Sequence, residues 1–423
     1  MKKLFTLGLL CGLALSLNAQ YMKLDASFYS EALDEIKKVD IYLPADYYEN
    51  LEQDYAVIYY LHGAGGDENE GHTFALRYYA LHSMDTSITS PPAIFVSPDG
   101  SCEPYSGSDY LNSELYGNFG DYTTFDLIEF IENNFRAKPI REFRFVCGTS
   151  MGGFGSAFHA TDKPELFRAS FPFIGFPAVS DSGIINWANL IYEENESYHD
   201  INYSAGINSK LILTIAGGFS PNMSLPNFVE LPWDSTGALI DSVVDKWNRY
   251  DASRKVRDFP NDLEMAFFLG CGTQDYMGTY PLNLQFKDSL DFYEIPCQYN
   301  FFEGGHVDDF ITWQKGFHWM DSIINYSFQT EGVEIIQKEP STLSLYPNPA
   351  NNTIHISLQS KNFATATISI YNHLGQKMGS EIPFETIVGN NELSLDISFF
   401  KNGIYFIQLS ADGRMLTKKF IKL

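Results

Sequence analysis

Residues 143–158 read FRFVCGTSMGGFGSAF and contain the only Gly-x-Ser-x-Gly pattern of the chain, with Ser150 at its centre. The apolar run before Gly148 predicts a strand, and the small residues after Gly152 predict the start of a helix. A serine on such a turn has a strained backbone, so its close neighbours must be small, and the two glycines meet this demand. Its hydroxyl is exposed beside a helix N-terminus, where developing negative charge is stabilised. We therefore predict that Ser150 is a nucleophile.

The segments around this turn alternate between strand and helix. Apolar runs predict strands over residues 56–61, 93–97, 143–147, 170–174, 265–269 and 298–303, helices over 72–84, 122–135, 280–293 and 310–324, and an antiparallel hairpin over 28–33 and 35–43. Continuous apolar runs are typical of strands that are covered on both faces. We predict an α/β fold, with a mostly parallel central sheet and helices on both faces. Ligands bind such sheets at the carboxyl ends of the strands.

Two strand ends supply the other groups that a nucleophilic serine needs, a base and an acid that orients the base. His306 follows the last predicted strand after two glycines, and Asp275 follows the strand before it. Together with Ser150 they stand in the chain order serine, acid, histidine. Three nearby carboxylates are alternatives for the acid: Asp288, Asp308 and Asp309. The first falls inside a predicted helix, and the other two are placed as caps of the next helix.

The loop after the first parallel strand reads YLHGAGG over residues 60–66. Its glycines allow backbone N–H groups to turn toward a substrate carbonyl, and an oxyanion hole needs one such donor plus one from the residue after the nucleophile. We predict the amides of Ala64 and Met151, with Gly63 or Gly65 as close alternatives to Ala64. His62 is predicted to contact the substrate.

Composition excludes several classes of function. The chain has 28 Lys and Arg against 53 Asp and Glu, a formal charge of −25, which opposes binding to nucleic acid or to an anionic membrane. There is no Cys-x-x-Cys or His-Glu-x-x-His motif, so we predict no metal and no cofactor. Four cysteines are predicted to be free thiols, although export would permit disulfides: Cys102, Cys147, Cys271 and Cys297.

The two ends of the chain differ from its middle. Residues 1–19 carry two lysines, an apolar stretch and a small-residue cleavage site, which predict a signal peptide and leave no membrane span in the mature protein. The leucines before Cys11 disfavour a lipoprotein. Residues 343–423 have seven basic against five acidic residues and alternate with period two, which predicts a β-sandwich of about seven short strands. The α/β domain is predicted over 20–328, with a polar linker over 329–342.

Residues 34–326 resemble the esterase D-like α/β-hydrolases, which include feruloyl, acetyl-xylan and tributyrin esterases, S-formylglutathione hydrolases and mycolyltransferases. The matching motifs lie at residues 62–66, 97–100, 112–113, 117–122, 148–153, 272–275 and 304–306. The family's nucleophile, acid and base fall on Ser150, Asp275 and His306, which implies a serine esterase, with acylated polysaccharide as a plausible substrate class. Residues 207–258 depart from the family pattern and are predicted to form a lid or pocket wall. Within them, Trp233 is predicted to contact the substrate.

The last 81 residues resemble the sorting domains of the type 9 secretion system, on the strength of LYPNP at 345–349, GIY at 403–405 and the basic end TKKFIKL at 417–423. This resemblance implies that the secretion machinery is a partner and that the protein is released or held at the cell surface. Two other functions stay open: acyl transfer to a sugar acceptor, and non-catalytic carbohydrate binding on a hydrolase fold.

Overall fold

The computed structural model describes residues 21–260, 263–331, 343–360, 364–372, 376–386, 389–411 and 414–423. It divides into two compact units, Met1–Gln329 and Thr330–Leu423. The predicted signal peptide and residues 332–342 of the predicted linker lie outside the described residues. Residues 329–331 of that linker belong to helix α10, Phe310–Glu331.

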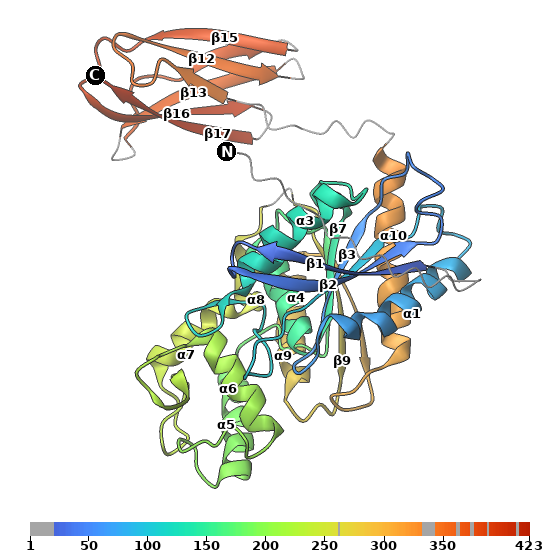
Figure 1. Ribbon diagram of the computed structural model, residues 1–423. Helices are drawn as coiled ribbons and strands as arrows, with labels where there is room; N and C mark the ends of the chain where they lie inside the picture. Colours follow the sequence, from blue (N-terminus) through green and yellow to red (C-terminus); the bar gives the residue numbers. More distant parts are fainter. Residues whose placement is uncertain are drawn as a thin grey trace. The chain divides into compact units, whose positions relative to one another are not determined.

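An eight-stranded sheet forms the centre of the first unit (Figure 1), with the order β1-β2-β4-β3-β7-β8-β9-β10. The strands are β1 Tyr21–Ser30, β2 Glu35–Pro44, β3 Val57–Leu61, β4 Ile94–Pro98, β7 Arg144–Thr149, β8 Ala169–Phe173, β9 Ala266–Gly272 and β10 Cys297–Phe302. All neighbours from β4 to β10 pair in parallel, whereas β2 is antiparallel to both β1 and β4. The prediction of a mostly parallel sheet is confirmed. The hairpin is longer than predicted, because β1 begins at Tyr21 rather than at residue 28. The polar residues that alternate with apolar ones in residues 21–27 do not form the continuous apolar run from which the other strands were predicted.

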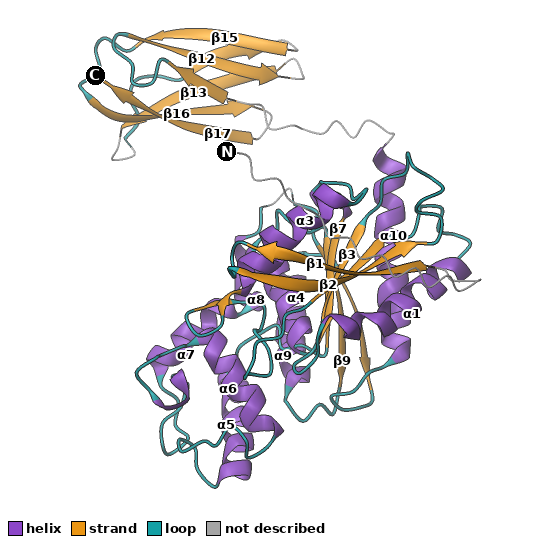
Figure 2. Cartoon of the chain, viewed as in Figure 1, coloured by secondary structure: helices purple, strands orange, loops and turns teal. Residues whose placement is uncertain are grey.

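Helices cover both faces of this sheet (Figure 2), as predicted. On one face, α1 (Gly71–Met84) and α10 bury an aromatic cluster that includes Tyr78 and Trp313. On the other face lie α3 (Leu127–Asn134), α4 (Met151–Asp162), α8 (Ala252–Lys255) and α9 (Thr279–Phe292). The parallel strands β3, β4 and β8 are buried along their whole length, as their continuous apolar runs indicate.

A helical insertion lies between β8 and β9, at the carboxyl end of the sheet. It contains α5 (Asp181–Asn195), α6 (Ile207–Phe219) and α7 (Asp241–Trp247), which pack around their own apolar cluster. The sequence predicted a wall over residues 207–258, but α5 was not predicted. The shorter elements are β5 Asn112–Ser113, β6 Gly117–Asn118, α2 Phe119–Asp121, the π-helical turn Tyr122–Asp126, and the 3-10 turns Glu68–Glu70, Arg141–Phe143, Pro226–Phe228, Asn248–Tyr250 and Val256–Asp258.

The second unit consists of two antiparallel sheets. One has the order β11-β12-β15 (Leu343–Tyr346, Thr353–Ser360, Gly389–Asp396), and the other the order β14-β13-β16-β17 (Ile382–Thr386, Ala364–Asn372, Gly403–Ala411, Arg414–Lys422). One buried cluster draws on both sheets, including Ile356 of β12, Ile370 of β13 and Ile407 of β16. The predicted small β-sandwich of seven strands is therefore confirmed for the described residues.

Candidate active site

Ser150 lies on the turn between β7 and α4. Its backbone angles are φ 54° and ψ −110°, a conformation that residues other than glycine rarely adopt. The turn is close to the neighbouring strand β3: a Cβ on Gly152 would collide with the Leu61 carbonyl, and one on Gly148 would collide with the Gly152 carbonyl. Glycine is therefore required at both positions, as predicted from the motif. The strained backbone presents the serine hydroxyl at the carboxyl end of the sheet.

The structure brings Ser150, His306 and Asp275 together from three separate strand ends. Ser150 Oγ lies 2.9 Å from His306 Nε2, and His306 Nδ1 lies 2.8 Å from Asp275 Oδ2. The Asp275 side chain is fully buried, whereas that of His306 is 17% exposed. This is the hydrogen-bonded order in which a histidine can take a proton from a serine while a carboxylate orients its ring.

Two further groups fix the Asp275 carboxylate. Oδ1 accepts a hydrogen bond from the Met277 N–H at 2.9 Å, and Oδ2 accepts one from the Thr279 hydroxyl at 2.5 Å. Thr279 also lies 3.1 Å from the Cys271 thiol, whose pKa burial raises to about 12, so that thiol stays neutral. Each carboxylate oxygen therefore has a protein donor besides the histidine.

The three alternative acids lie elsewhere. Asp288 is exposed on α9. Asp308 forms a bidentate pair with Arg77 at 2.9 and 2.6 Å, and Asp309 accepts from the Thr312 N–H at 2.8 Å at the start of α10. In the part of the chain that the structure describes, Asp275 is the carboxylate hydrogen-bonded to His306.

The loop after β3 leaves one of its three candidate amides unpaired. The Gly63 N–H faces the Glu70 carboxylate at 3.3 Å, and the Gly65 N–H donates to the Ser106 carbonyl at 2.6 Å. Among the described residues the Ala64 N–H has no acceptor. The Met151 amide opens α4 ahead of that helix's own hydrogen bonds. Ala64 and Met151 both line the pocket beside Ser150, so their amides are the free donors of the predicted pair.

The two residues that were predicted to contact the substrate, His62 and Trp233, are buried in the core. His62 is fully buried: Gly100 N–H donates to its Nε2 at 2.9 Å, and its Nδ1 lies 2.8 Å from the Gly63 carbonyl. Trp233 is also fully buried, and its Nε1–H donates to the Tyr198 carbonyl at 2.9 Å. Neither side chain is accessible to a ligand, because hydrogen bonds to distant backbone atoms hold both inside the core.

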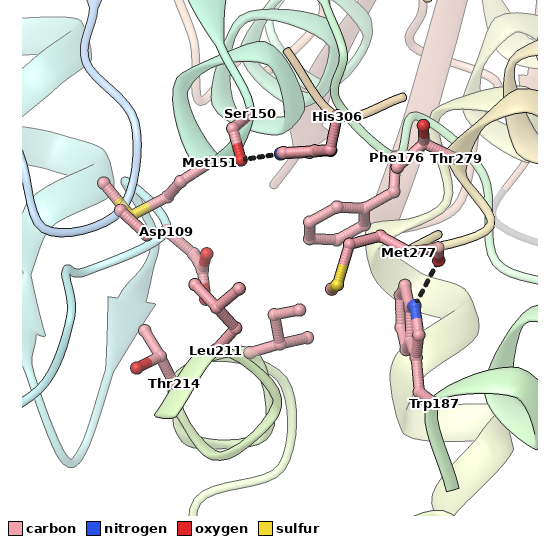
Figure 3. A pocket seen from close by; sticks show the side chains of 12 residues that line it. Asp109, Ser150, Met151, Phe176, Trp187, Leu211, Thr214, Met277, Thr279 and His306 are labelled. Atoms are coloured by element: carbon pink, nitrogen blue, oxygen red, sulfur yellow. Dashed lines mark hydrogen bonds between the residues drawn. The ribbon is translucent and has the colours of Figure 1, made fainter. Parts of the chain in front are cut away.

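A pocket opens directly beside the Ser150–His306 pair (Figure 3). Its other walls are mostly apolar and come from the β8–α5 loop, the helical insertion and the loop after β9: Phe176, Trp187, Leu211, Ile215 and Met277. The sequence did not identify these residues, because they resemble ordinary core positions. Asp109 and Thr214 add polar groups to the lining. Burial raises the pKa of the Asp109 carboxyl to about 7.

Within the described part of the chain there is no group of three or more metal-ligating side chains, and no helix is long and apolar enough to cross a membrane. The four described cysteines are free thiols, and Cys147 and Cys271 are buried.

Two family models match the sequence of this chain. The family model described as "Putative esterase" covers residues 30–321 of this chain. The chain belongs to this esterase family. A second match covers residues 344–423, the secretion system C-terminal sorting domain, so the terminal β-sandwich belongs to that class of sorting domains.

Individual relatives are distant. The chain is 25% identical over 284 residues to an esterase of Mycobacterium tuberculosis. This alignment covers 66% of this chain and 54% of that protein. The chain thus spans about half the length of the curated relatives that it matches. Among solved structures it is similar to a ferulic acid esterase (17% identity, 74% of this chain and 100% of that chain, TM-score 0.49) and to an S-formylglutathione hydrolase from Agrobacterium tumefaciens (18%, 74% and 97%, TM-score 0.47).

Proposed function

We propose that this protein is a serine carboxylic-ester hydrolase that acts outside the cell. The observation that supports the proposal most strongly is the hydrogen-bonded series from Ser150 through His306 to the buried Asp275. A second supporting observation is that Ala64 and Met151, whose amides have no acceptor among the described residues, line the pocket beside Ser150.

In the proposed reaction, His306 Nε2 takes the Ser150 proton while Oγ attacks the ester carbonyl carbon. The amides of Ala64 and Met151 donate to the carbonyl oxygen as it becomes negative. Asp275 holds the ring with Nδ1 protonated and stabilises the imidazolium that forms. Collapse of the tetrahedral intermediate expels the alcohol, which takes the proton from His306. Water then hydrolyses the acyl-enzyme by the same steps.

We propose a substrate with an acyl group of the acetyl or feruloyl type, carried on a polysaccharide or a related ester; the mostly apolar pocket lining is consistent with such an acyl group. Phe176 and Trp187 provide aromatic walls that suit a ring as well as a short chain. Export is proposed through a signal peptide at residues 1–19 and the terminal sorting domain, which would engage the type 9 secretion machinery.

The test is labelling with a fluorophosphonate probe together with hydrolysis of acetyl, butyryl and feruloyl esters by the purified chain. We expect labelling and turnover, both abolished in Ser150→Ala. A protein that is folded but neither labelled nor active would be a binding protein on a hydrolase fold. Product that accumulates only when a sugar acceptor is added would instead identify an acyltransferase.

A further inference from the structure

The pocket wall carries a buried carboxyl group without a protein partner. Asp109 is 2% exposed, and its Oδ2 atom has no hydrogen-bond partner among the described residues. It lines the same pocket as Ser150 and His306, where Figure 3 shows its side chain between Met151 and Leu211. An unpaired buried carboxyl is unfavourable in the free protein, which calls for an explanation.

The backbone holds this carboxyl in place. Asp109 and Tyr110 both have left-handed φ values, 50° and 56°. On one side, Ser108 Oγ donates to the Gly100 carbonyl at 2.8 Å, and on the other the buried Tyr110 hydroxyl donates to the His62 carbonyl at 3.2 Å. Since both neighbours are anchored, the backbone that carries the Asp109 carboxyl is held in place, and the carboxyl is 2% exposed. Strain of this kind is common where a residue is presented to a ligand.

The surroundings limit what could pair with it. No lysine or arginine side chain lines the pocket in the described residues, and the imidazole that does, that of His306, is hydrogen-bonded to Ser150 and Asp275. Figure 3 shows Met151, Leu211 and Thr214 beside Asp109. The Thr214 hydroxyl already donates to the Lys210 carbonyl at 2.8 Å. An ammonium group would have to lose its hydration among apolar side chains, whereas a neutral hydroxyl loses far less. The missing partner is therefore best supplied by a hydroxyl group that enters with the ligand.

We propose that Asp109 determines substrate specificity: its carboxyl accepts a hydrogen bond from a hydroxyl of the ester, so the enzyme prefers esters that carry a hydroxyl on the part that enters the pocket. This inference rests on the proposed esterase function. The hydroxyl could belong to the acyl group or to the alcohol, and the chemistry at Asp109 is the same in both cases.

The experiment compares kcat/KM for matched pairs of esters that differ in one hydroxyl. In the acyl arm, methyl 4-hydroxycinnamate is compared with methyl cinnamate, and methyl 3- and 4-hydroxybutanoate with methyl butanoate. In the alcohol arm, 2-hydroxyethyl butanoate is compared with ethyl butanoate. Each pair is measured for the wild type, Asp109→Leu, Asp109→Asn and the exposed control Asp288→Asn, and the fluorophosphonate labelling rate checks that each variant keeps its reactive serine.

We expect the wild type and Asp288→Asn to prefer the hydroxylated ester by about 10-fold or more in at least one arm, as for a buried polar group whose partner is missing. In Asp109→Leu the ratio of kcat/KM between the hydroxylated ester and its plain partner should fall to about 1. Asp109→Asn, which keeps one acceptor, should show an intermediate preference and replaces the leucine variant if that variant does not fold.

Equal kcat/KM within every pair of both arms for the wild type, or a preference that survives in Asp109→Leu, would overturn the proposal. A wild type that is neither labelled nor active on any ester would overturn the esterase function itself.

Discussion

The triad and the pocket wall opposite it satisfy their polar groups in different ways. Asp275 receives hydrogen bonds on both carboxylate oxygens from the protein, whereas Asp109 has one oxygen with no partner among the described residues. The first carboxylate orients a histidine and must be fixed before substrate arrives. In our proposal, the second carboxyl gains its hydrogen-bond partner only when a hydroxylated ligand binds. In the function proposed above, the reaction therefore depends on groups that the protein satisfies internally, whereas recognition depends on a group that the protein leaves without a partner.

The largest expected effect comes from removing the nucleophile. Ser150→Ala deletes one oxygen and leaves the sheet and the loop of Ala64 intact, so we expect the variant to fold with an unchanged melting temperature. Turnover of any ester should fall by about 10⁴-fold or more. The measurement is kcat on a chromogenic ester, with circular dichroism as the fold control. Activity above a few per cent of the wild type would place the chemistry on another residue.

Asp275→Asn tests the internally satisfied carboxylate. An amide in its place no longer selects the correct tautomer of His306, so we expect kcat to fall by roughly 10³–10⁴-fold while KM changes little. Asp288→Asn, Asp308→Asn and Asp309→Asn serve as matched controls. Each should lose far less, because none contacts His306 in the described structure. A larger loss in any control would reassign the acid.

Glu70 is hydrogen-bonded to the loop of the proposed oxyanion hole. Its carboxylate faces the Gly63 N–H and accepts from the Tyr60 hydroxyl at 2.7 Å, so it holds the loop that presents the Ala64 amide. We expect Glu70→Gln to lower kcat roughly 10-fold, less than the loss of a donor itself, with KM nearly constant. Tyr60→Phe should show a smaller change in the same direction. Wild-type kcat in both variants would mean that the Gly65–Ser106 bond alone positions the loop.

The site residues that could be predicted from the sequence are those that local patterns identify, and the residues that were missed depend on contacts between distant segments. Strand periodicity and glycine spacing predicted Ser150, His306 and Asp275, because each follows a strand end that the sheet topology brings to one edge. His62 and Trp233 were predicted as ligand contacts, but their burial depends on Gly100 and Tyr198, far away in sequence. Asp109 was not identified, since an aspartate in the polar loop GSDYLNS looks like an ordinary turn residue. Helix α6 packs against that loop and places Gly218 beside the Asp109 carboxyl, a contact between residues that are far apart in the sequence.

The unsatisfied carboxyl should leave a signature in stability. Burial raises the pKa of Asp109 from 3.8 to about 7, so between these pH values the native state holds a proton that the unfolded chain has lost. Protonation of Asp109 therefore stabilises the native state at low pH, and this contribution to the free energy of unfolding is lost as the pH rises to about 7. The loss amounts to up to about 4 kcal/mol, at ~1.36 kcal/mol per pKa unit. Asp109→Asn removes the titration. Its melting temperature should exceed that of the wild type by several degrees at pH 8 and match it near pH 4.

Differential scanning calorimetry at pH 4, 6 and 8 measures this difference, with Asp288→Asn as the exposed control, for which we expect no comparable trend. The opposite trend, with the advantage of Asp109→Asn largest at acid pH, would contradict a buried unpaired carboxyl. If the stabilised variant Asp109→Asn also shows the reduced, intermediate preference for hydroxylated esters, the same carboxyl accounts for both the instability and the recognition.

The smallest expected effect concerns the terminal unit. The triad, the oxyanion loop and the pocket wall all belong to residues of the first unit, and the terminal sandwich has its own buried core. A chain that ends at Glu331 keeps all of α10, including Phe328, whose ring packs 4.7 Å from that of Phe143. We therefore expect kcat/KM, and the ratio between hydroxylated and plain esters, to stay within about 2-fold of the full chain, since independent units contribute additively. In a host that has the type 9 machinery, the same truncation should leave the protein in the periplasm, as immunoblotting of cell fractions would show.

A purified truncation that loses esterase activity would mean that the terminal unit helps to form the site. The interpretation of the terminal unit as a sorting domain alone would then be wrong.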